Sequence, residues 1–171
     1  CIDKAPVGVY TKAITSYLPD RMALPTEFTA ADAVSLYTDF FADFDRTKAN
    51  AMLADLHLNQ HDRIGAMSKG TQEKMQLCLT MSRAAKLYLL DEPLGGVDPA
   101  AREYILNTIL HNYSEDAALV LSTHLIGDIE KVLDEVIFLK DGSVMRQVGV
   151  DELREETGTS VDAYFREAYK C

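Results

Sequence analysis

The stretch LYLLDEPLGGVD, residues 87–98, limits the possible fold of this chain more than any other part of the sequence. Leu87 to Leu90 form an apolar run of the length of a buried strand, and Asp91 and Glu92 stand at its end. Two adjacent carboxylates repel each other, so we expect something positively charged in front of them. A proline and a glycine pair follow and predict a tight loop after the strand.

Composition narrows the class of protein. The chain has 171 residues, of which 47% are hydrophobic, enough for one globular domain with a core. Its formal net charge of −10 argues against a nucleic-acid partner and against adhesion to an anionic membrane, because both bind through Lys and Arg. The three cysteines, Cys1, Cys78 and Cys171, set no disulfide framework or zinc site, which indicates a reducing cytosol.

Segments of strand and helix type alternate along the chain, which predicts a mostly parallel, layered α/β sheet. Thr29 and Asp32 have the spacing of a helix N-terminal cap and its acidic partner. Strand patterns occupy the first twenty residues and residues 87–90, 117–124, 135–140 and 144–149. Helical patterns occupy residues 26–44, 45–56, 100–116, 125–134 and the charged tail from about residue 150. Another helix is expected after the loop that holds Ser68 and Gly70, with Met75, Cys78 and Leu79 on one face.

Three further segments have residue types suited to ligand binding. MSKGT, residues 67–71, precedes a helix, so its backbone N–H groups and the helix dipole can face an anion. His124 follows a buried strand pattern, at the edge where α/β sheets bind ligands. Each segment alone has a plain structural explanation: Ser68 as a helix cap, His124 as a loop residue, GGVD as an ordinary turn, and the two adjacent acids as solvated side chains.

Taken in order, SYLPD, MSKGT, LYLLDEP, GGVD and STH resemble the motifs of the ATP-binding cassette (ABC) family. The resemblance runs from about Ile14 to Gly142. It implies an ABC-type P-loop NTPase fold, with a mostly parallel sheet flanked by helices and an α-helical subdomain. The SKG and DEPLGGVDP forms are most similar to bacterial exporter-type ATPases of the subgroup encoded beside GntR-type regulators. The implied single domain divides into residues 1–25, 26–85, 86–149 and 150–171.

The resemblance also implies a role for each motif residue, with ATP and Mg²⁺ as cofactors. Glu92 is the catalytic carboxylate that activates water, and His124 holds the γ-phosphate and that water in line. Asp91 binds Mg²⁺ through water. The implied nucleotide contacts are the signature residues Ser68, Lys69 and Gly70, which face ATP held by a partner subunit, Asp98 of the D-loop, and Asp20 at the Q-loop position.

The same resemblance implies partners and a location. ABC ATPases hold two ATP molecules head to tail between two subunits, which are identical or different. The Q-loop couples this dimer to a transmembrane permease, so the implied location is the cytoplasmic face of the cell membrane. No nucleic-acid partner is expected.

Several positions depart from the commonest family pattern. Asp20 replaces a Gln, Lys69 and Thr71 replace a Gly and a Gln, and Leu94 stands where Thr or Ser is frequent. A larger departure is that none of the nine glycines is followed by Lys, so the phosphate-binding loop GxxxxGK[ST] is missing. We expect an N-terminally truncated piece of a longer ATPase that is inactive alone; the alternative is a natural cassette that never had the loop.

Two other functions stay open. One is a soluble ABC protein acting on ribosomes or DNA, although ribosome-acting members carry two cassettes and DNA-repair members a long coiled coil between Q-loop and signature. Here one set of motifs occurs, and the gap from Asp20 to Met67 is short. The other is a non-catalytic interaction or regulatory module that offers only its signature face to a complete cassette.

Overall fold

The computed structural model describes residues 1–114 and 116–169 and divides the chain into two compact units. The first unit ends at Thr123 and the second begins at His124. Glu115, within the helix predicted over residues 100–116, and the last two residues of the predicted tail, including Cys171, lie outside the described part. The division of one domain into four segments stays a prediction.

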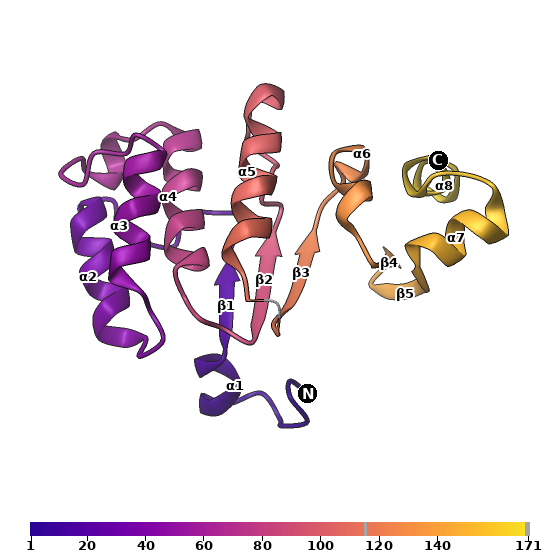
Figure 1. Cartoon of the computed structure of the whole chain (residues 1–171), viewed down its shortest axis with the longest axis horizontal. Helices are drawn as coiled ribbons and strands as arrows, with labels where there is room; N and C mark the ends of the chain where they lie inside the picture. The colour runs from indigo at the N-terminus through magenta and orange to yellow at the C-terminus, as the bar shows by residue number, and fades with distance from the viewer. Residues whose placement is uncertain (115, 170–171) are drawn as a thin grey trace. The chain divides into compact units, whose positions relative to one another are not determined.

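The first unit contains a three-stranded parallel sheet in the order β1-β2-β3 (Figure 1). Its strands are β1 Thr15–Leu18, β2 Leu87–Asp91 and β3 Ala118–Ser122. Leu90 of β2 is in register with Leu18 and Leu121, so the carboxyl ends of all three strands lie along one edge. The predicted parallel α/β sheet is therefore confirmed.

The two faces of this sheet differ in burial. On the covered face, Tyr88 and Leu90 are 1% and 2% exposed. Ser16, in register with Tyr88, donates a hydrogen bond of 2.8 Å to the Thr80 carbonyl of helix α4, which places α4 on this face. On the open face, Tyr17 is 54% exposed and Val120 is 50% exposed. A sheet with one uncovered face presents its carboxyl-end side chains to solvent on that side.

A block of helices packs beside the sheet (Figure 1). It comprises α2 Ala30–Phe40, α3 Arg46–Asp55, η1 Ile64–Ala66 and α4 Lys69–Met81, and α5 Pro99–Asn112 follows β2. Helix α2 begins as predicted: Thr29 Oγ1 accepts a hydrogen bond from the Asp32 N–H, and Asp32 Oδ2 accepts one from the Thr29 N–H. This reciprocal cap satisfies two backbone donors that the helix itself leaves unpaired.

Arg83, 4% exposed, joins the helical block to the start of the sheet. Its guanidinium donates hydrogen bonds of 3.0 and 3.1 Å to the Asp43 carboxylate, and others to the carbonyls of Thr15 (2.6 Å) and Ala13 (2.5 Å). It also lies 3.9 Å from the centroid of the Phe41 ring. A buried guanidinium with all these partners fixes the α2–α3 connection against β1.

The first twenty residues differ from the prediction of strand-type structure. Only Thr15–Leu18 is a strand; Val9–Ala13 forms the short helix α1. Thr11 Oγ1 accepts a hydrogen bond from the Gly8 N–H (2.8 Å) and donates one to the Gly8 carbonyl (3.0 Å), which closes a helical turn locally. Val9, the first residue of this helix, is 90% exposed.

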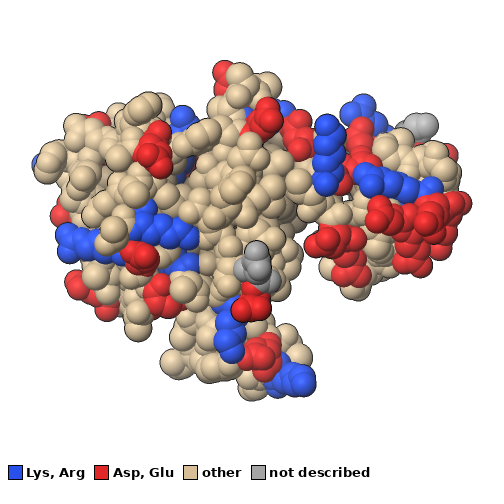
Figure 2. Space-filling model, viewed as in Figure 1, with Lys and Arg blue, Asp and Glu red and all other residues tan. Residues whose placement is uncertain are grey.

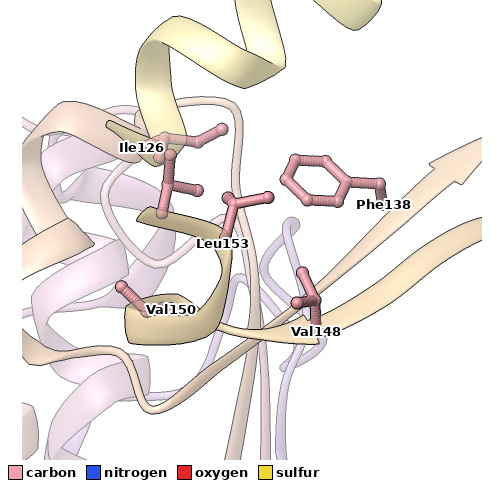
Figure 3. Packing of buried hydrophobic residues seen from close by; sticks show 6 residues of the cluster. Ile126, Phe138, Val148, Val150 and Leu153 are labelled. Carbon is pink, nitrogen blue, oxygen red and sulfur yellow. The ribbon is translucent and has the colours of Figure 1, made fainter. Parts of the chain in front are cut away.

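The second unit is built on the antiparallel hairpin of β4 and β5. Its elements are α6 Ile126–Ile129, η2 Glu130–Val132, β4 Glu135–Lys140, β5 Ser143–Gly149, α7 Val150–Thr157 and α8 Val161–Ala168. Figure 3 shows Ile126, Phe138, Val148, Val150 and Leu153 packed together. This small core explains why the predicted strand pair at residues 135–140 and 144–149 forms.

Charge is unevenly spread over the surface. Figure 2 shows acidic side chains gathered on the second unit, where α7 carries Asp151, Glu152, Glu155 and Glu156.

Within the described residues, no helix combines the length and the apolar character that crossing a bilayer requires.

The described cysteines are free thiols. Cys78 lies buried in α4, and burial raises the pKa of its thiol to about 12. The thiol is therefore neutral at physiological pH and has a structural part in the core.

Candidate functional site

Asp91 is the last residue of β2 and belongs to the open face of the sheet. Ser122, the last residue of β3, is in register with it and donates a 2.5 Å hydrogen bond from its hydroxyl to Asp91 Oδ1. This bond fixes the rotation of the carboxylate. Since parallel α/β sheets bind ligands at the carboxyl ends of their strands, Asp91 lies in the position that a ligand site requires.

Glu92, the next residue, has a left-handed backbone with φ 47°. Its N–H donates to the Ser122 carbonyl at 3.0 Å and to the Ser122 hydroxyl at 3.3 Å. A left-handed conformation costs a residue with a side chain on the order of 1 kcal/mol, and such strain concentrates at functional sites. Ser122 therefore holds both the carboxylate of Asp91 and the backbone of Glu92.

Gly95 and Gly96 have no side chains, and two glutamates, Glu92 and Glu73, pack close to them. A Cβ atom on Gly95 would lie 3.3 Å from the Cβ of Glu92. A Cβ atom on Gly96 would lie 2.1 Å from Oε1 and 2.6 Å from Oε2 of Glu73, a residue of α4. Glu73 thus occupies the space that a side chain at position 96 would need, and it links α4 to the loop after β2.

Asp98, at the end of GGVD, caps helix α5. Its Oδ1 accepts a hydrogen bond of 2.9 Å from the Ala100 N–H, and Pro99 occupies the first helical position. The local geometry of this loop end is therefore explained by helix capping. The nucleotide contact expected for Asp98 stays a prediction.

Ser68 caps helix α4, as the plain structural explanation of MSKGT has it. Its Oγ accepts a hydrogen bond from the Thr71 N–H at 3.2 Å and lies 2.7 Å from Thr71 Oγ1. Gly70 has no atom within 4 Å of the position of a Cβ, so the first turn of the helix is open on that side. An open helix start leaves backbone donors accessible to an anion, and this cap does not conflict with the predicted phosphate contact.

Lys69 and Glu73, one turn apart on α4, form an ion pair with 3.5 Å between Lys69 Nζ and Glu73 Oε1. The lysine side chain is 75% exposed, so the pair adds little to stability. Among the described residues, Oε2 of Glu73 is buried and has no hydrogen-bond partner. Glu73 therefore lies between Lys69, the predicted signature lysine, and the loop at Gly96.

Asp20 lies in the turn between β1 and α2, exposed and 4.0 Å from the Nε of Arg21. Residues of this turn and of α4 together line a cavity of about 290 Å³. Its lining residues are Asp20, Arg21, Met22, Lys69, Gln72, Glu73 and Gln76. The structure therefore brings the predicted Q-loop position and the predicted signature lysine to one cavity.

His124 is the first residue of the second unit and follows β3 by two positions. The other predicted site residues all belong to the first unit. The role of His124 beside the carboxylates stays a prediction.

A magnesium site was predicted at Asp91. Over residues 1–114 and 116–169, no group of three or more His, Cys, Asp and Glu side chains is placed to hold a metal ion. A nucleotide-bound Mg²⁺ needs only one or two protein carboxylates, because phosphate oxygens and water complete its coordination. Asp91, oriented by Ser122, fits this smaller requirement.

Sequence reasoning missed three residues of this region: Ser122, Glu73 and Gln76. Ser122 stands two positions before His124 in STH, but its place beside Asp91 depends on the register of β2 and β3, which strand alternation does not set. Glu73 and Gln76 act through contacts with segments far away in sequence. Their residue types on α4 carry no local signal of those contacts.

Comparisons with known proteins give a family and a fold. Residues 17–127 match the family model described as "AAA domain, putative AbiEii toxin, Type IV TA system". The ABC transporter ATP-binding protein YtrB of Bacillus subtilis is 27% identical over 141 residues, which cover 82% of this chain and 48% of that protein. The SkfA peptide export ATP-binding protein SkfE of the same organism is 25% identical over 162 residues, covering 91% and 67%.

Solved structures agree. The structure titled "Structure of ATP binding subunit of ABC transporter" superposes with a TM-score of 0.83 at 23% identity, covering 93% of this chain and 70% of that one. The "Dimeric structure of a post-hydrolysis state of the ATP-binding cassette MJ0796 bound to ADP and Pi" gives 0.67 at 21% identity, covering 79% and 62%. These likenesses confirm the predicted ABC-type α/β fold.

The alignments cover most of this chain but only part of each relative. The chain spans about half the length of YtrB and of a second B. subtilis relative, YxlF, at 48% and 52%.

Proposed function

The chain belongs to this AAA-domain family and has the fold of an ABC ATPase, and we propose that it is part of the ATP-binding and ATP-hydrolysing subunit of an ABC transporter. One observation carries the proposal: Asp91 and Glu92 stand together at the carboxyl end of β2, and Ser122 of the neighbouring strand holds them both. The names of the relatives support the same function, because YtrB and SkfE are both ATP-binding proteins of transport systems.

The two carboxylates have different roles in this proposal. Asp91, held at Oδ1 by Ser122, would hold the Mg²⁺ of the nucleotide through water, and that ion would supply positive charge to the phosphates. Glu92 orients the attacking water and accepts its proton. The positive φ of Glu92 marks the residue at which the backbone leaves the extended conformation of β2.

The remaining predicted residues contribute to nucleotide contacts. Ser68, Lys69 and Gly70, at the open start of α4, face ATP held by a second ATPase subunit. Asp98 at the D-loop position and Asp20 at the Q-loop position contribute further nucleotide contacts. His124 holds the γ-phosphate.

The proposed partners follow from the same function. A second cassette subunit, identical or different, completes the site, and a transmembrane permease uses the energy of hydrolysis. The protein then lies on the cytoplasmic face of the membrane, bound through the permease. The subgroup encoded beside GntR-type regulators stays a prediction.

ATP turnover by the complete gene product tests this function. Wild type should hydrolyse MgATP, and Glu92→Gln should lower kcat by at least about 100-fold, since a positioned general base contributes roughly that much. Glu103→Gln, an exposed glutamate on α5, is the matched control and should keep the wild-type rate. A wild-type rate in Glu92→Gln would contradict the proposal.

The 171-residue chain itself gives a second prediction. Because no Gly is followed by Lys in its sequence, it lacks the residues that cradle the nucleotide phosphates. We expect no hydrolysis above background and little affinity for MgATP, measured by a phosphate-release assay and by calorimetry. Clear turnover that Glu92→Gln abolishes would show that the carboxylates work without that loop.

A further inference from the structure

The turn at residues 19–23, which carries Asp20, is held at both ends by one side chain. Gln76 of α4 accepts a hydrogen bond from the Ala23 N–H at its Oε1 (2.9 Å) and donates one from its Nε2 to the Pro19 carbonyl (3.3 Å). The turn is therefore tied to α4 at its first and last residues, with Asp20 and Arg21 between the two ties.

Gln76 is unusual among its neighbours on α4. It is 7% exposed and sits beside Met75 and Leu77, which are 0% and 2% exposed. Burying an amide costs free energy unless its donor and its acceptor are both bonded. Here the oxygen and the nitrogen both bond to the backbone of the turn, so the turn is what satisfies this side chain.

The tie has a direct geometric consequence. Asp20 and Arg21 of the turn line the 290 Å³ cavity together with Lys69, Glu73 and Gln76 of α4. Position 76 lies within the same helix that begins at the predicted signature residues. The Gln76 amide thus ties the backbone on either side of Asp20 to the helix that carries Lys69.

We propose that Gln76 is a positioning residue that fixes the Asp20 turn to α4, so that the turn and the signature end of the helix move as one body. Gln76 touches no nucleotide in this arrangement; it acts through Asp20. The inference deepens the proposed ATPase function and rests on it only for the role of Asp20. The tie itself can be tested without nucleotide.

The rate at which trypsin cleaves the 171-residue chain after Arg21 measures how firmly Gln76 holds the turn. Arg21 is 94% exposed and its peptide bond to Met22 lies between the two bonded ends of the turn. Gln76→Leu keeps the size of the side chain and removes both hydrogen bonds. Loss of two such bonds should raise the cleavage rate at Arg21 by about ten-fold or more, because cleavage follows the population of the open turn.

The same helix offers a matched control. Gln72, one turn earlier, donates its Nε2 hydrogen bond to the Ile64 carbonyl (2.8 Å) and none to the turn at residues 19–23. Gln72→Leu should leave cleavage at Arg21 at the wild-type rate. Gln76→Glu keeps the acceptor for Ala23 but turns a carboxylate oxygen toward the Pro19 carbonyl, so it should also raise the cleavage rate at Arg21.

The outcomes separate a local tie from general destabilisation. In Gln76→Leu, cleavage at Arg63, an exposed site of the same unit, should stay unchanged. Equal acceleration at Arg63 and Arg21, or no acceleration at Arg21, would overturn the proposal. If Gln76→Leu does not fold, Gln76→Glu decides by the same two rates.

A double-mutant cycle tests the action through Asp20. In the complete gene product, Gln76→Leu should lower ATP turnover by about three-fold or more, and it should have no further effect in an Asp20→Ala background. Additive effects would contradict a positioning role. If the wild-type gene product hydrolyses no ATP, the proposed function fails, whereas the digestion result still decides whether Gln76 ties the turn.

Discussion

The two faces of the parallel sheet differ in what they do for the protein. The covered face is core: Tyr88 and Leu90 are 1% and 2% exposed. The open face carries Tyr17 and Val120, 54% and 50% exposed, and ends in Asp91. The same three strands therefore bury core side chains on one face and carry the proposed catalytic carboxylate at the end of the other.

This difference follows from strand geometry. Successive side chains of a strand point to opposite faces, so Leu90 and Asp91 are neighbours in sequence and belong to different surroundings. A carboxylate at the end of the covered face would be costly because burial removes its hydration. On the open face, Asp91 stays half-buried and needs only the Ser122 hydroxyl to hold it.

The largest expected effect is on the covered face. Leu90→Ala should lower the free energy of unfolding of the chain by about 3 kcal/mol, because it leaves a cavity in a packed core. Val120→Ala, on the open face of the adjacent strand, is the matched variant and should cost less than about 1 kcal/mol. Urea unfolding followed by circular dichroism measures both. Equal costs would show that the two faces are equally buried in solution.

A smaller effect is expected where the open face holds Asp91. Ser122→Ala removes the hydroxyl that bonds Asp91 and the Glu92 N–H, at an expected cost of about 1–2 kcal/mol, since a hydrogen bond to a charged group contributes that order. Ser122→Thr keeps the hydroxyl and should unfold at nearly the wild-type urea concentration. Loss of stability in both variants alike would mean that the hydroxyl is not what matters.

The smallest effect is expected where α4, on the covered side, meets the loop leaving β2. Gly96→Ala must displace the Glu73 carboxylate, which is the far end of a flexible chain, so the cost should be about 1 kcal/mol or less. In a Glu73→Ala background the same change should cost nothing. Unfolding free energies of the four proteins give the coupling directly. A cost that persists without Glu73 would place the clash elsewhere.

The sequence predicted what depends on local pattern. The cap of α2 by Thr29 and Asp32, the strand at residues 87–90 and the parallel sheet were all readable, because capping and alternation act over a few residues. Helix α1 was missed because Thr11 closes its turn on Gly8, whereas its residue types favour a strand.

The residues of the candidate site also divide into those that a sequence pattern reveals and those that it does not. Its motif residues could be named from order and spacing, but their supports could not. The bond from Ser122 to Asp91 joins residues 31 apart in sequence, and the bond from Gln76 to Ala23 joins residues 53 apart. Such contacts arise from tertiary packing, which periodicity does not encode.

The most direct test of the central claim is the Mg²⁺ dependence of ATP hydrolysis by the complete gene product. The account predicts that Asp91→Asn raises the Mg²⁺ concentration for half-maximal activity by about ten-fold or more, since it removes the negative charge that holds the hydrated ion. Glu92→Gln should lower kcat and leave that concentration unchanged. An unchanged Mg²⁺ requirement in Asp91→Asn, together with wild-type turnover in Glu92→Gln, would contradict the assignment of these two carboxylates.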